Sequence, residues 1–247
     1  RLSEHFRVYA AVPRFLIAKG LAGFTSSLFE DQIGGTVGLE TMAEAHRSAS
    51  SRLIYGTDGY ELMVCMHGKR LREGDILVID EFHERNLNQD ILVAYARQQI
   101  IRGAKFKLLI MSATIDAKKV SKYFGDAPML NIPGRQYPIE MLPAESTWEE
   151  SALKLIKGAR DSAKEGQPYS VLVIAPGKRK VYQLIANLRK MGVTEKMFPV
   201  HSELSPREQA CVLERYDDEV VVFVSTNISE SGVTSPSVRA VLDTGEV

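Results

Sequence analysis

Short, nearly continuous hydrophobic runs alternate along the chain with longer segments in which hydrophobic residues recur every three or four positions. Six runs rich in Val, Ile and Leu are typical of strands buried on both faces, at 7–12, 76–79, 107–111, 170–174, 219–225 and 238–243. Six longer segments predict helices, at 15–29, 87–101, 117–123, 148–164, 178–191 and 206–216. The alternation of strand and helix predicts an α/β fold with parallel sheets.

One segment breaks this alternation. Residues 132–138 read Ile-Pro-Gly-Arg-Gln-Tyr-Pro, and Pro143 follows. Prolines and glycines at this density are typical of a connection between domains. The sequence therefore predicts two α/β lobes, at residues 1–137 and 138–247.

Composition narrows the possible functions. The 247 residues carry 31 Lys and Arg against 31 Asp and Glu, so the net charge is zero. This balance argues against a protein that coats nucleic acid by charge alone, but it is compatible with a few phosphate contacts from backbone and hydroxyl groups. No hydrophobic run reaches the length of a membrane span, and residues 1–6 do not resemble a secretory signal. With only Cys65 and Cys211, in no metal-ligand spacing, we expect reduced thiols and a cytoplasmic protein without a membrane partner.

An acidic turn follows the second hydrophobic run. Asp80-Glu81-Phe82-His83 comes directly after residues 76–79, and the carboxyl ends of parallel strands are where α/β sheets bind ligands. Asp80 could hold a magnesium ion, which prefers oxygen ligands and bridges phosphates. Glu81 could activate water for phosphoryl transfer. A solvated charged turn is the alternative interpretation.

A small hydroxyl motif follows the next strand. Ser112-Ala113-Thr114 comes after residues 107–111, where its hydroxyl groups could hydrogen-bond to the acidic turn. These residues could also simply cap the helix expected at 117–123, and the two roles are compatible.

Taken in order, these and other motifs resemble the DEAH/RHA branch of the superfamily 2 helicases. Pro13-Arg14 resembles motif Ia, Thr57-Asp58-Gly59 motif Ib, Asp80 to His83 the DEAH box, and Ser112 to Thr114 motif III. In the second lobe, Pro176-Gly177 resembles motif IV and residues 225–234 motif V. The resemblance covers essentially the whole chain.

The resemblance implies two tandem RecA-like P-loop NTPase lobes with parallel sheets, ATP and Mg²⁺ as cofactors, and ATP bound between the lobes. It implies single-stranded RNA as the partner, with little sequence preference, and it leaves room for an activator protein. The catalytic residues it implies are Asp80, Glu81, His83, Ser112 and Thr114, with Asp80 and Glu81 at the metal. The nucleotide-binding residues would be Asp80, Glu81, Ser229, Gly232 and Thr234. The RNA-binding residues would be Pro13, Arg14, Thr57, Asp58, Gly59, Pro176, Gly177, Lys178, Thr226 and Asn227.

The chain also departs from the family pattern. It contains no G-x-x-x-x-G-K-S/T loop and no Gln- and Arg-rich motif VI after Asp243. Phe82 stands where the family has Ala, and Ser231-Gly232 where it has Thr-Ser. We therefore expect both lobes to be truncated and this chain alone to lack ATPase activity.

Three functions remain open at this point. The chain could be part of an ATP-dependent RNA helicase, a catalytically dead binding or scaffold fragment, or part of a related DNA-directed ATPase. His201-Ser202 could suggest nucleophilic catalysis, but no acid at triad spacing accompanies the pair, which favours a structural role or one beside RNA. The run Lys178-Arg179-Lys180 is either a solvated helix face or a phosphate contact.

Overall fold

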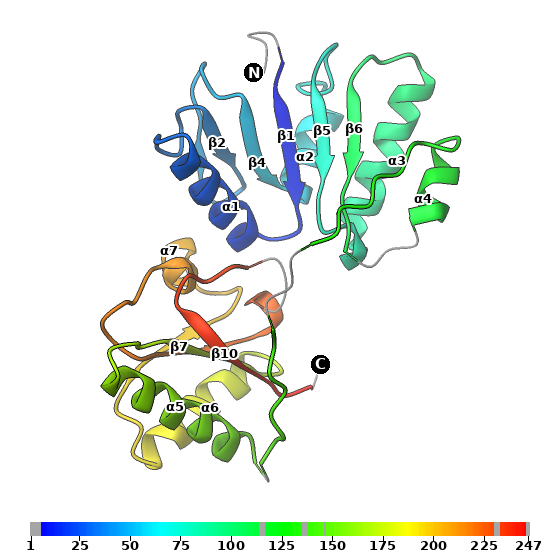
Figure 1. Ribbon diagram of the computed structural model, residues 1–247. Coiled ribbons are helices and arrows are strands. Elements are labelled where there is room, and N and C mark those ends of the chain that lie inside the picture. Colours follow the sequence, from blue (N-terminus) through cyan, green and yellow to red (C-terminus); the bar gives the residue numbers. More distant parts are fainter. Residues whose placement is uncertain (1–5, 114–116, 135–137, 146, 230–232, 246–247) are drawn as a thin grey trace. The chain divides into compact units, whose positions relative to one another are not determined.

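The computed structural model describes residues 6–113, 117–134, 138–145, 147–229 and 233–245. Contacts between Cα atoms divide the chain into two units, Arg1–Ile139 and Glu140–Val247. The sequence places the boundary between residues 137 and 138, beside residues 135–137, which lie outside the described ranges. Each unit is an α/β body built on one sheet (Figure 1).

The first unit is built on a six-stranded sheet with the strand order β3-β2-β4-β1-β5-β6. Its strands are β1 (Val8–Val12), β2 (Val37–Glu40), β3 (Ala45–His46), β4 (Leu53–Thr57), β5 (Ile76–Ile79) and β6 (Lys107–Ile110). All neighbouring pairs are parallel except β2 and β3. The carboxyl ends of β1, β4 and β5 therefore meet at one edge of the sheet, and their side chains can form one site.

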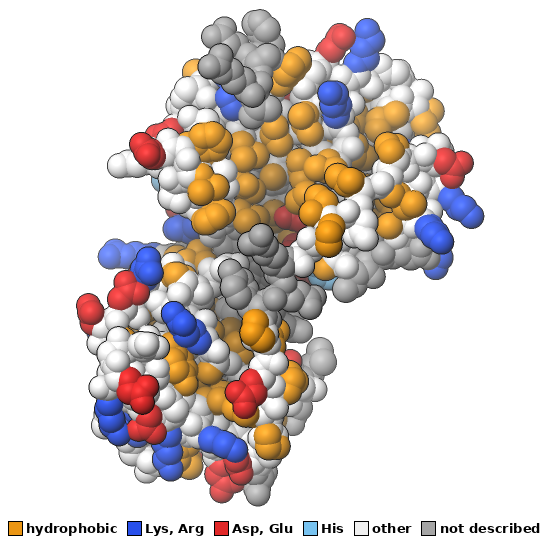
Figure 2. Space-filling model, in the orientation of Figure 1, with side chains coloured by type: hydrophobic (Ala, Val, Ile, Leu, Met, Phe, Trp, Pro, Cys, Tyr) orange, Lys and Arg blue, Asp and Glu red, His pale blue; other side chains and the backbone are white. Residues whose placement is uncertain are grey.

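Helices cover this sheet unevenly. They are α1 (Phe15–Leu28), α2 (Asp58–Met66), the 3₁₀ turn η1 (Phe82–Glu84), α3 (Leu87–Ile101) and α4 (Ala117–Tyr123). One core cluster joins α2 and α3 to the sheet, with Leu62, Leu77, Ile79 and Leu92 at most 8% exposed. On the opposite face, α1 lies over β2 and β4, and Figure 2 shows hydrophobic side chains gathered over the part of the sheet that α1 leaves open.

Strand β6 forms the edge of this sheet, and its exposed residues point away from the core. Leu108 and Ile110 pack against the cluster beneath α3, whereas Leu109 is 49% exposed. Parallel strands normally lie between two covering layers. The alternation of covered and open positions shows that only one face of β6 is covered by the described residues.

The second unit has a parallel four-stranded sheet with the order β10-β7-β9-β8. Its strands are β7 (Ser170–Ile174), β8 (Lys196–Val200), β9 (Val221–Ser225) and β10 (Val238–Asp243). Its helical segments are α5 (Trp148–Lys164), α6 (Lys178–Lys190), α7 (Pro206–Gln209) and the 3₁₀ turns η2 (Ala210–Leu213) and η3 (Asn227–Ser229). Every residue of β7 and β9 is buried, and their inward side chains pack with Ile156 of α5 and Leu188 of α6.

The predicted α/β architecture with parallel sheets is confirmed, and the six predicted strands and most of the predicted helices lie where the pattern placed them. The helix expected at 206–216 is wrong in its length. Ser205 caps its start through a reciprocal capping box with Glu208, but α7 ends at Gln209 and continues only as a 3₁₀ turn to Leu213. Both cysteines are buried and unpaired. In the described ranges, no helix has the length and hydrophobicity of a membrane span.

Candidate active site

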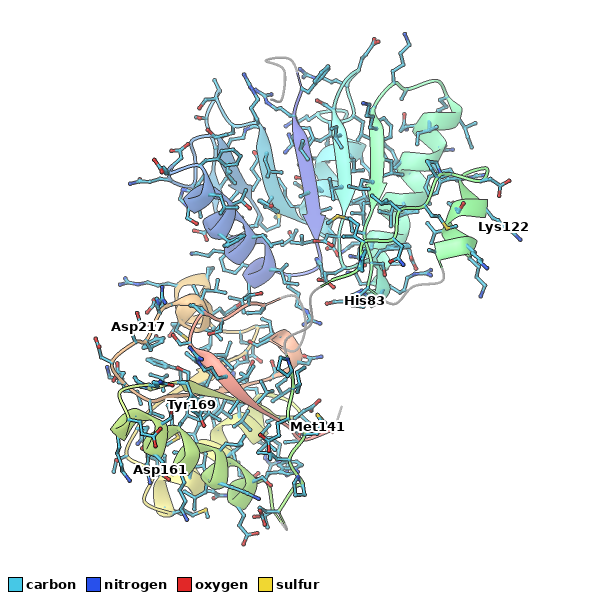
Figure 3. All side chains as sticks on the ribbon, viewed as in Figure 1. His83, Lys122, Met141, Asp161, Tyr169 and Asp217 are labelled. Carbon is cyan, nitrogen blue, oxygen red and sulfur yellow. The ribbon has the colours of Figure 1, made fainter. Side chains whose placement is uncertain are left out.

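The acidic turn Asp80-Glu81 lies at the carboxyl end of β5, and η1 follows it at once. Glu81 has φ of 53° and Arg85, just after η1, has φ of 49°, so two residues with side chains adopt the left-handed conformation. Each such residue costs about 1 kcal/mol or more, and structures keep this strain mainly at functional sites. In Figure 3, His83 lies at the end of the first sheet to which β1 and β5 point.

Two neighbouring carboxyl groups dominate the electrostatics of this turn. Burial raises the pKa of Asp80, although its Oδ1 accepts a hydrogen bond from the Glu81 N–H at 2.8 Å. Burial, followed by the negative charge of Asp80, raises the pKa of Glu81. His83 Nε2 lies 3.3 Å from Glu81 Oε2 and can hold that carboxylate in place. A carboxylate whose pKa is raised is a better general base.

Buried contacts hold the turn against its neighbours. The Gln89 side chain, fully buried in the first turn of α3, donates to the Asp80 carbonyl oxygen at 2.9 Å. The Phe82 N–H donates to the Met111 carbonyl oxygen at 3.1 Å, which brings the segment after β6 beside the acidic turn. Ser112 is the next residue in this segment, and Thr114 lies outside the described ranges.

Two polar contacts connect the ends of β1 and β4 to the segment just after the acidic turn. Arg14, the residue before α1, places Nη2 at 3.3 Å from Glu84 Oε2. Asp58, the first residue of α2, accepts a hydrogen bond at 2.5 Å from Asn86 Nδ2. The sequence-predicted motif Ia and Ib segments, which include Pro13, Thr57 and Gly59, thus lie at the same sheet edge as the acidic turn.

The donor set at this turn fits a magnesium ion held mainly by its nucleotide. Mg²⁺ usually takes only one or two protein carboxylates and completes its shell with water and phosphate oxygens. Asp80 and Glu81 supply two half-buried carboxylates. Within the described part of the chain, no group of three or more His, Cys, Asp and Glu could hold a metal by itself.

The corresponding sheet edge of the second unit carries hydroxyl and backbone groups instead of carboxylates. Gly177, with φ of 87°, ends the turn after β7 and precedes α6. Ser225 at the end of β9 donates to the Thr226 carbonyl oxygen at 2.7 Å, and its hydroxyl lies 3.0 Å from that of Ser229. The Thr226 N–H donates to the Val200 carbonyl oxygen at 2.9 Å. The loops after β7, β8 and β9 therefore lie at one edge.

The remaining predicted residues of the second unit differ in exposure. Ser229 is buried, whereas Gly177, Lys178, Asn227 and Thr234 are exposed. Pro176 and Thr226 are half-buried, and Gly232 lies outside the described ranges. Lys178 forms an ion pair with Glu203, and Lys180 lies 5.4 Å above the Trp148 ring, so this basic run has protein partners of its own.

His201 is buried at the end of β8, and its Nε2 lies 3.0 Å from the Tyr182 hydroxyl. No hydrogen bond joins it to a carboxylate in the described part of the chain, and Ser202 is exposed. This arrangement favours the structural interpretation over a catalytic triad.

Sequence reasoning assigned no role to three residues that position the site. Glu84, Asn86 and Gln89 connect the acidic turn to Arg14, to Asp58 and to the Asp80 backbone. The available signal was their closeness in sequence to the acidic motif Asp80 to His83. Because their role depends on contacts with distant segments, the sequence alone did not reveal it.

Comparisons with known proteins agree with this geometry. Residues 150–245 match the family described as the helicase conserved C-terminal domain. The chain is 30% identical over 240 residues to the ATP-dependent RNA helicase HrpA of Escherichia coli (strain K12), a match that covers 94% of this chain and 18% of that protein. It is 32% identical over 207 residues to the chloroplastic ATP-dependent RNA helicase DEAH11 of Arabidopsis thaliana, covering 80% of this chain and 12% of that protein.

The solved structure of the Escherichia coli DEAH/RHA helicase HrpB superposes with a TM-score of 0.72 and 27% identity, covering 96% of this chain and 31% of that one. The chain thus spans less than a third of the relatives described here. The order of motifs, the fold and these similarities agree, and together they support a DEAH-box superfamily 2 helicase.

Proposed function

We propose that this chain is part of an ATP-dependent RNA helicase that couples ATP hydrolysis to movement along RNA or to its unwinding. The observation that carries the proposal is the Asp80-Glu81 turn, where two carboxyl groups of raised pKa lie on a strained backbone at the end of a parallel strand. The relatives HrpA and DEAH11 bear the names of ATP-dependent RNA helicases, which supports the same function.

In this proposal the acidic turn performs the chemistry. Asp80 would hold Mg²⁺, and a bound ion would supply positive charge for the transferred phosphoryl group. Glu81 accepts a proton from the attacking water, for which its raised pKa suits it. His83, Ser112 and Thr114 would couple ATP hydrolysis at this turn to RNA unwinding. In the second unit, the residues that would contact the nucleotide are Ser229, Gly232 and Thr234.

RNA contact is proposed for the loops at the carboxyl ends of the strands. Arg14 and Thr57 to Gly59 belong to the first unit, and Pro176 to Lys178, Thr226 and Asn227 to the second. Arg14 already faces the Glu84 carboxylate at 3.3 Å. An RNA phosphate would compete with Glu84 for Arg14, so RNA binding would alter the segment that follows the catalytic turn. Such a shared residue offers a direct physical connection between RNA binding and hydrolysis.

An ATPase assay on a longer protein that contains this chain, with and without added nucleic acid, tests the proposal. Single-stranded RNA should stimulate phosphate release from ATP, and matched DNA should stimulate it much less. DNA stimulation equal to that by RNA would favour the DNA-directed ATPase. No hydrolysis with either nucleic acid, despite retained binding, would favour the scaffold fragment.

The 247-residue chain by itself is expected to hydrolyse ATP at a negligible rate. It contains no G-x-x-x-x-G-K-S/T sequence to hold the β- and γ-phosphates. It also contains no Gln- and Arg-rich motif VI, and one arginine at the transferred phosphate can contribute roughly 10³–10⁵ in rate. Turnover by the purified chain at rates ordinary for helicases, lost in Glu81→Gln, would contradict this expectation.

RNA affinity should respond to single substitutions at the strand ends. Because the net charge is zero, we expect moderate salt dependence and little sequence preference. In the longer protein, Arg14→Ala should weaken RNA binding and lower the slope of log affinity against log salt by about 1. Thr226→Ala should weaken binding without changing that slope, because it removes no charge. Arg215→Ala, at an exposed arginine paired with Asp217, is the control. Equal affinity for RNA and DNA in all variants would remove the RNA-binding assignment.

A further inference from the structure

A second polar site lies in the first unit, away from the acidic turn. It is a cavity of about 610 Å³ between α2 and the strands, lined by Arg7, Tyr9, Glu40, Arg47, Arg52, Tyr60, Met63, Val64, Lys69, Arg70, Arg72, Glu73 and Asp75. None of these residues belongs to the nucleotide or RNA sites proposed above. The volume falls in the range of about 300–1,000 Å³ that is typical of ligand sites.

The register of the sheet explains why basic residues gather here. Arg7 directly precedes β1 and Arg52 directly precedes β4, and the two strands pair from Val8 with Leu53. Arg72 lies just before β5, where its N–H donates to Asp75 Oδ2 at 2.9 Å. Three arginines from distant parts of the sequence thus meet at the sheet edge where these strands begin, whereas the acidic turn lies where they end.

The floor of the cavity is a rigid arginine. The Arg70 side chain is only 4% exposed, and its guanidinium group lies 4.0 Å from the centre of the Tyr9 ring. Its Nε donates to the buried Glu61 at 3.2 Å, and its Nη2 forms a short contact with Glu40. Arg70 Nη1 has no hydrogen-bond partner among the described residues, and Arg70 contributes to the cavity wall. One donor edge of a fixed guanidinium is therefore available to a ligand.

Positive charge exceeds negative charge around this floor. Of the three acidic lining residues, Glu40 pairs with Arg47 and Arg70, and Glu73 pairs with Lys105 outside the cavity. Asp75 accepts the Arg72 N–H. In the described part of the chain, the side chains of Arg7, Arg52, Lys69 and Arg72 form no ion pair with a carboxylate, and the Arg52 side chain donates only to the Ala49 carbonyl oxygen. Like charges held together in this way favour the binding of an anion.

We propose that this cavity binds a phosphate-bearing ligand, either a small phosphorylated molecule or the backbone of a nucleic acid. Arginine forks suit phosphate oxygens, and a fixed guanidinium loses little freedom when it binds them. Tyr60, Met63 and Val64 form a less polar wall against which an attached ring or chain can lie. The site depends on neither ATP hydrolysis nor the acidic turn, so it stands or fails independently of the proposed helicase function.

Equilibrium dialysis of the 247-residue chain with radiolabelled inorganic pyrophosphate tests the proposal. The informative variant is the double substitution Lys69→Gln with Arg72→Gln, because both side chains are exposed and their loss leaves the core intact. The matched control is Arg102→Gln with Lys118→Gln, which removes two exposed charges of the same unit outside the cavity. Circular dichroism melts should be the same for all three proteins.

We expect pyrophosphate binding in the unsubstituted chain and in the control, weakened at least tenfold in the Lys69/Arg72 variant. A second arm uses a single-stranded RNA oligonucleotide with pyrophosphate as competitor. RNA binding that is weakened only by the cavity variant identifies the nucleic-acid backbone as the ligand, whereas pyrophosphate binding without RNA binding identifies a small phosphorylated molecule. Absence of binding by both probes, or equal weakening in cavity and control variants, overturns the proposal.

Discussion

Carboxyl groups whose pKa is raised by burial occur in the first unit, and the described residues of the second unit contain none. In the first unit, burial raises the pKa of Asp58, Glu61, Asp80 and Glu81. In the second unit, each carboxyl group with a shifted pKa has it lowered by a partner at the surface, and these groups are Asp161, Glu195, Glu203 and Glu208. Among the described residues, no carboxyl group of the second unit has a raised pKa.

This difference suggests two uses of carboxyl groups, one in the proposed chemistry of the first unit and one in stabilising the surface of the second. Burying a carboxylate costs free energy unless charges or hydrogen bonds compensate it, so a fold without further use for it would leave it at the surface. Of the four carboxyl groups named in the first unit, Asp58 and Glu61 are buried, and Asp80 and Glu81 are half-buried in the acidic turn. The second unit uses its acidic side chains in ion pairs and helix caps, as Glu195 with Arg160 and Glu208 at Ser205 show.

The largest expected effect is on hydrolysis. In a longer protein that hydrolyses ATP, Glu81→Gln should keep nucleotide binding and slow phosphate release by roughly 10²–10⁴-fold, because the substitution preserves shape and removes the proposed general base. Asp161→Asn, at an exposed carboxylate of the second unit, should leave the rate unchanged. Single-turnover phosphate release checks both. Wild-type rates in Glu81→Gln would show that raised pKa values in the first unit do not mark catalysis.

The next effect concerns stability and pH. Burial raises the pKa of Glu61 from its ordinary value of 4.5 to about 7. Since the folded state holds this proton more tightly than the unfolded chain, the contribution of Glu61 to stability is largest below about pH 4.5 and is lost as pH rises to about 7. One pKa unit corresponds to about 1.4 kcal/mol, so the loss is on the order of 3 kcal/mol.

Urea unfolding followed by circular dichroism at several pH values measures this contribution. In Glu61→Gln the decline between pH 4.5 and 7 in the first unit's transition should become smaller by the contribution of Glu61. The exposed Glu219, which pairs with Lys196 in the second unit, provides the control substitution Glu219→Gln. An unchanged pH dependence in Glu61→Gln would mean that Arg70 fully compensates the buried charge.

Asp80→Asn should have a smaller effect, limited to metal-dependent binding. The substitution removes one charged oxygen from the proposed magnesium set, and we expect at least about tenfold weaker binding of Mg²⁺–nucleotide. Binding of nucleotide in the presence of EDTA should not change. Fluorescent nucleotide titrations on the longer protein, with and without Mg²⁺, measure the metal-dependent and the metal-independent affinity separately. Equal weakening under both conditions would indicate that Asp80 supports the fold of the turn.

The smallest effect is expected at a surface pair of the second unit. Arg160 and Glu195 make a two-pronged contact in which Arg160 Nη2 lies 2.7 Å from Glu195 Oε2. The hydrogen bond from Arg160 lowers the pKa of Glu195, so its stabilisation is present above pH 4.5 and is lost as pH falls further. Glu195→Gln should cost about 0.5–1 kcal/mol at pH 7. Urea unfolding followed by the fluorescence of Trp148 reports on this unit. A cost above 3 kcal/mol would contradict the surface assignment.

Strands with a continuous apolar run could be predicted from the sequence. Elements were missed where a glycine, a proline or a polar residue interrupts the hydrophobic pattern. Strand β4 contains Gly56, where a Cβ atom would lie 2.7 Å from Glu61 Oε1, so packing against a buried acid interrupts its pattern. Strand β8 contains Pro199, which the sheet tolerates because β8 lies at its edge. Helix α2 starts at Asp58-Gly59, which reads as a turn, yet Leu62 and Cys65 pack into the core.

The site was predictable where a motif follows a strand directly, as at Asp80 and Glu81. It was not predictable where a role depends on register between distant strands. The contact of Arg14 with Glu84 joins residues 70 positions apart, and that of Asp58 with Asn86 joins residues 28 apart. The basic cavity is a further case, because only the alignment of β1, β4 and β5 brings Arg7, Arg52 and Arg72 together.

Two of the edge strands, β6 and β8, have different consequences for assembly. At β8, Pro199 has no N–H to offer to an incoming strand, so this edge resists lengthening of the sheet. At β6, the backbone is regular and Leu109 is 49% exposed, so this edge can accept a further strand and gain apolar contact as it does so. In concentrated solutions of the 247-residue chain, self-association should therefore proceed more readily through β6 than through β8, and a charged residue at position 109 should weaken it.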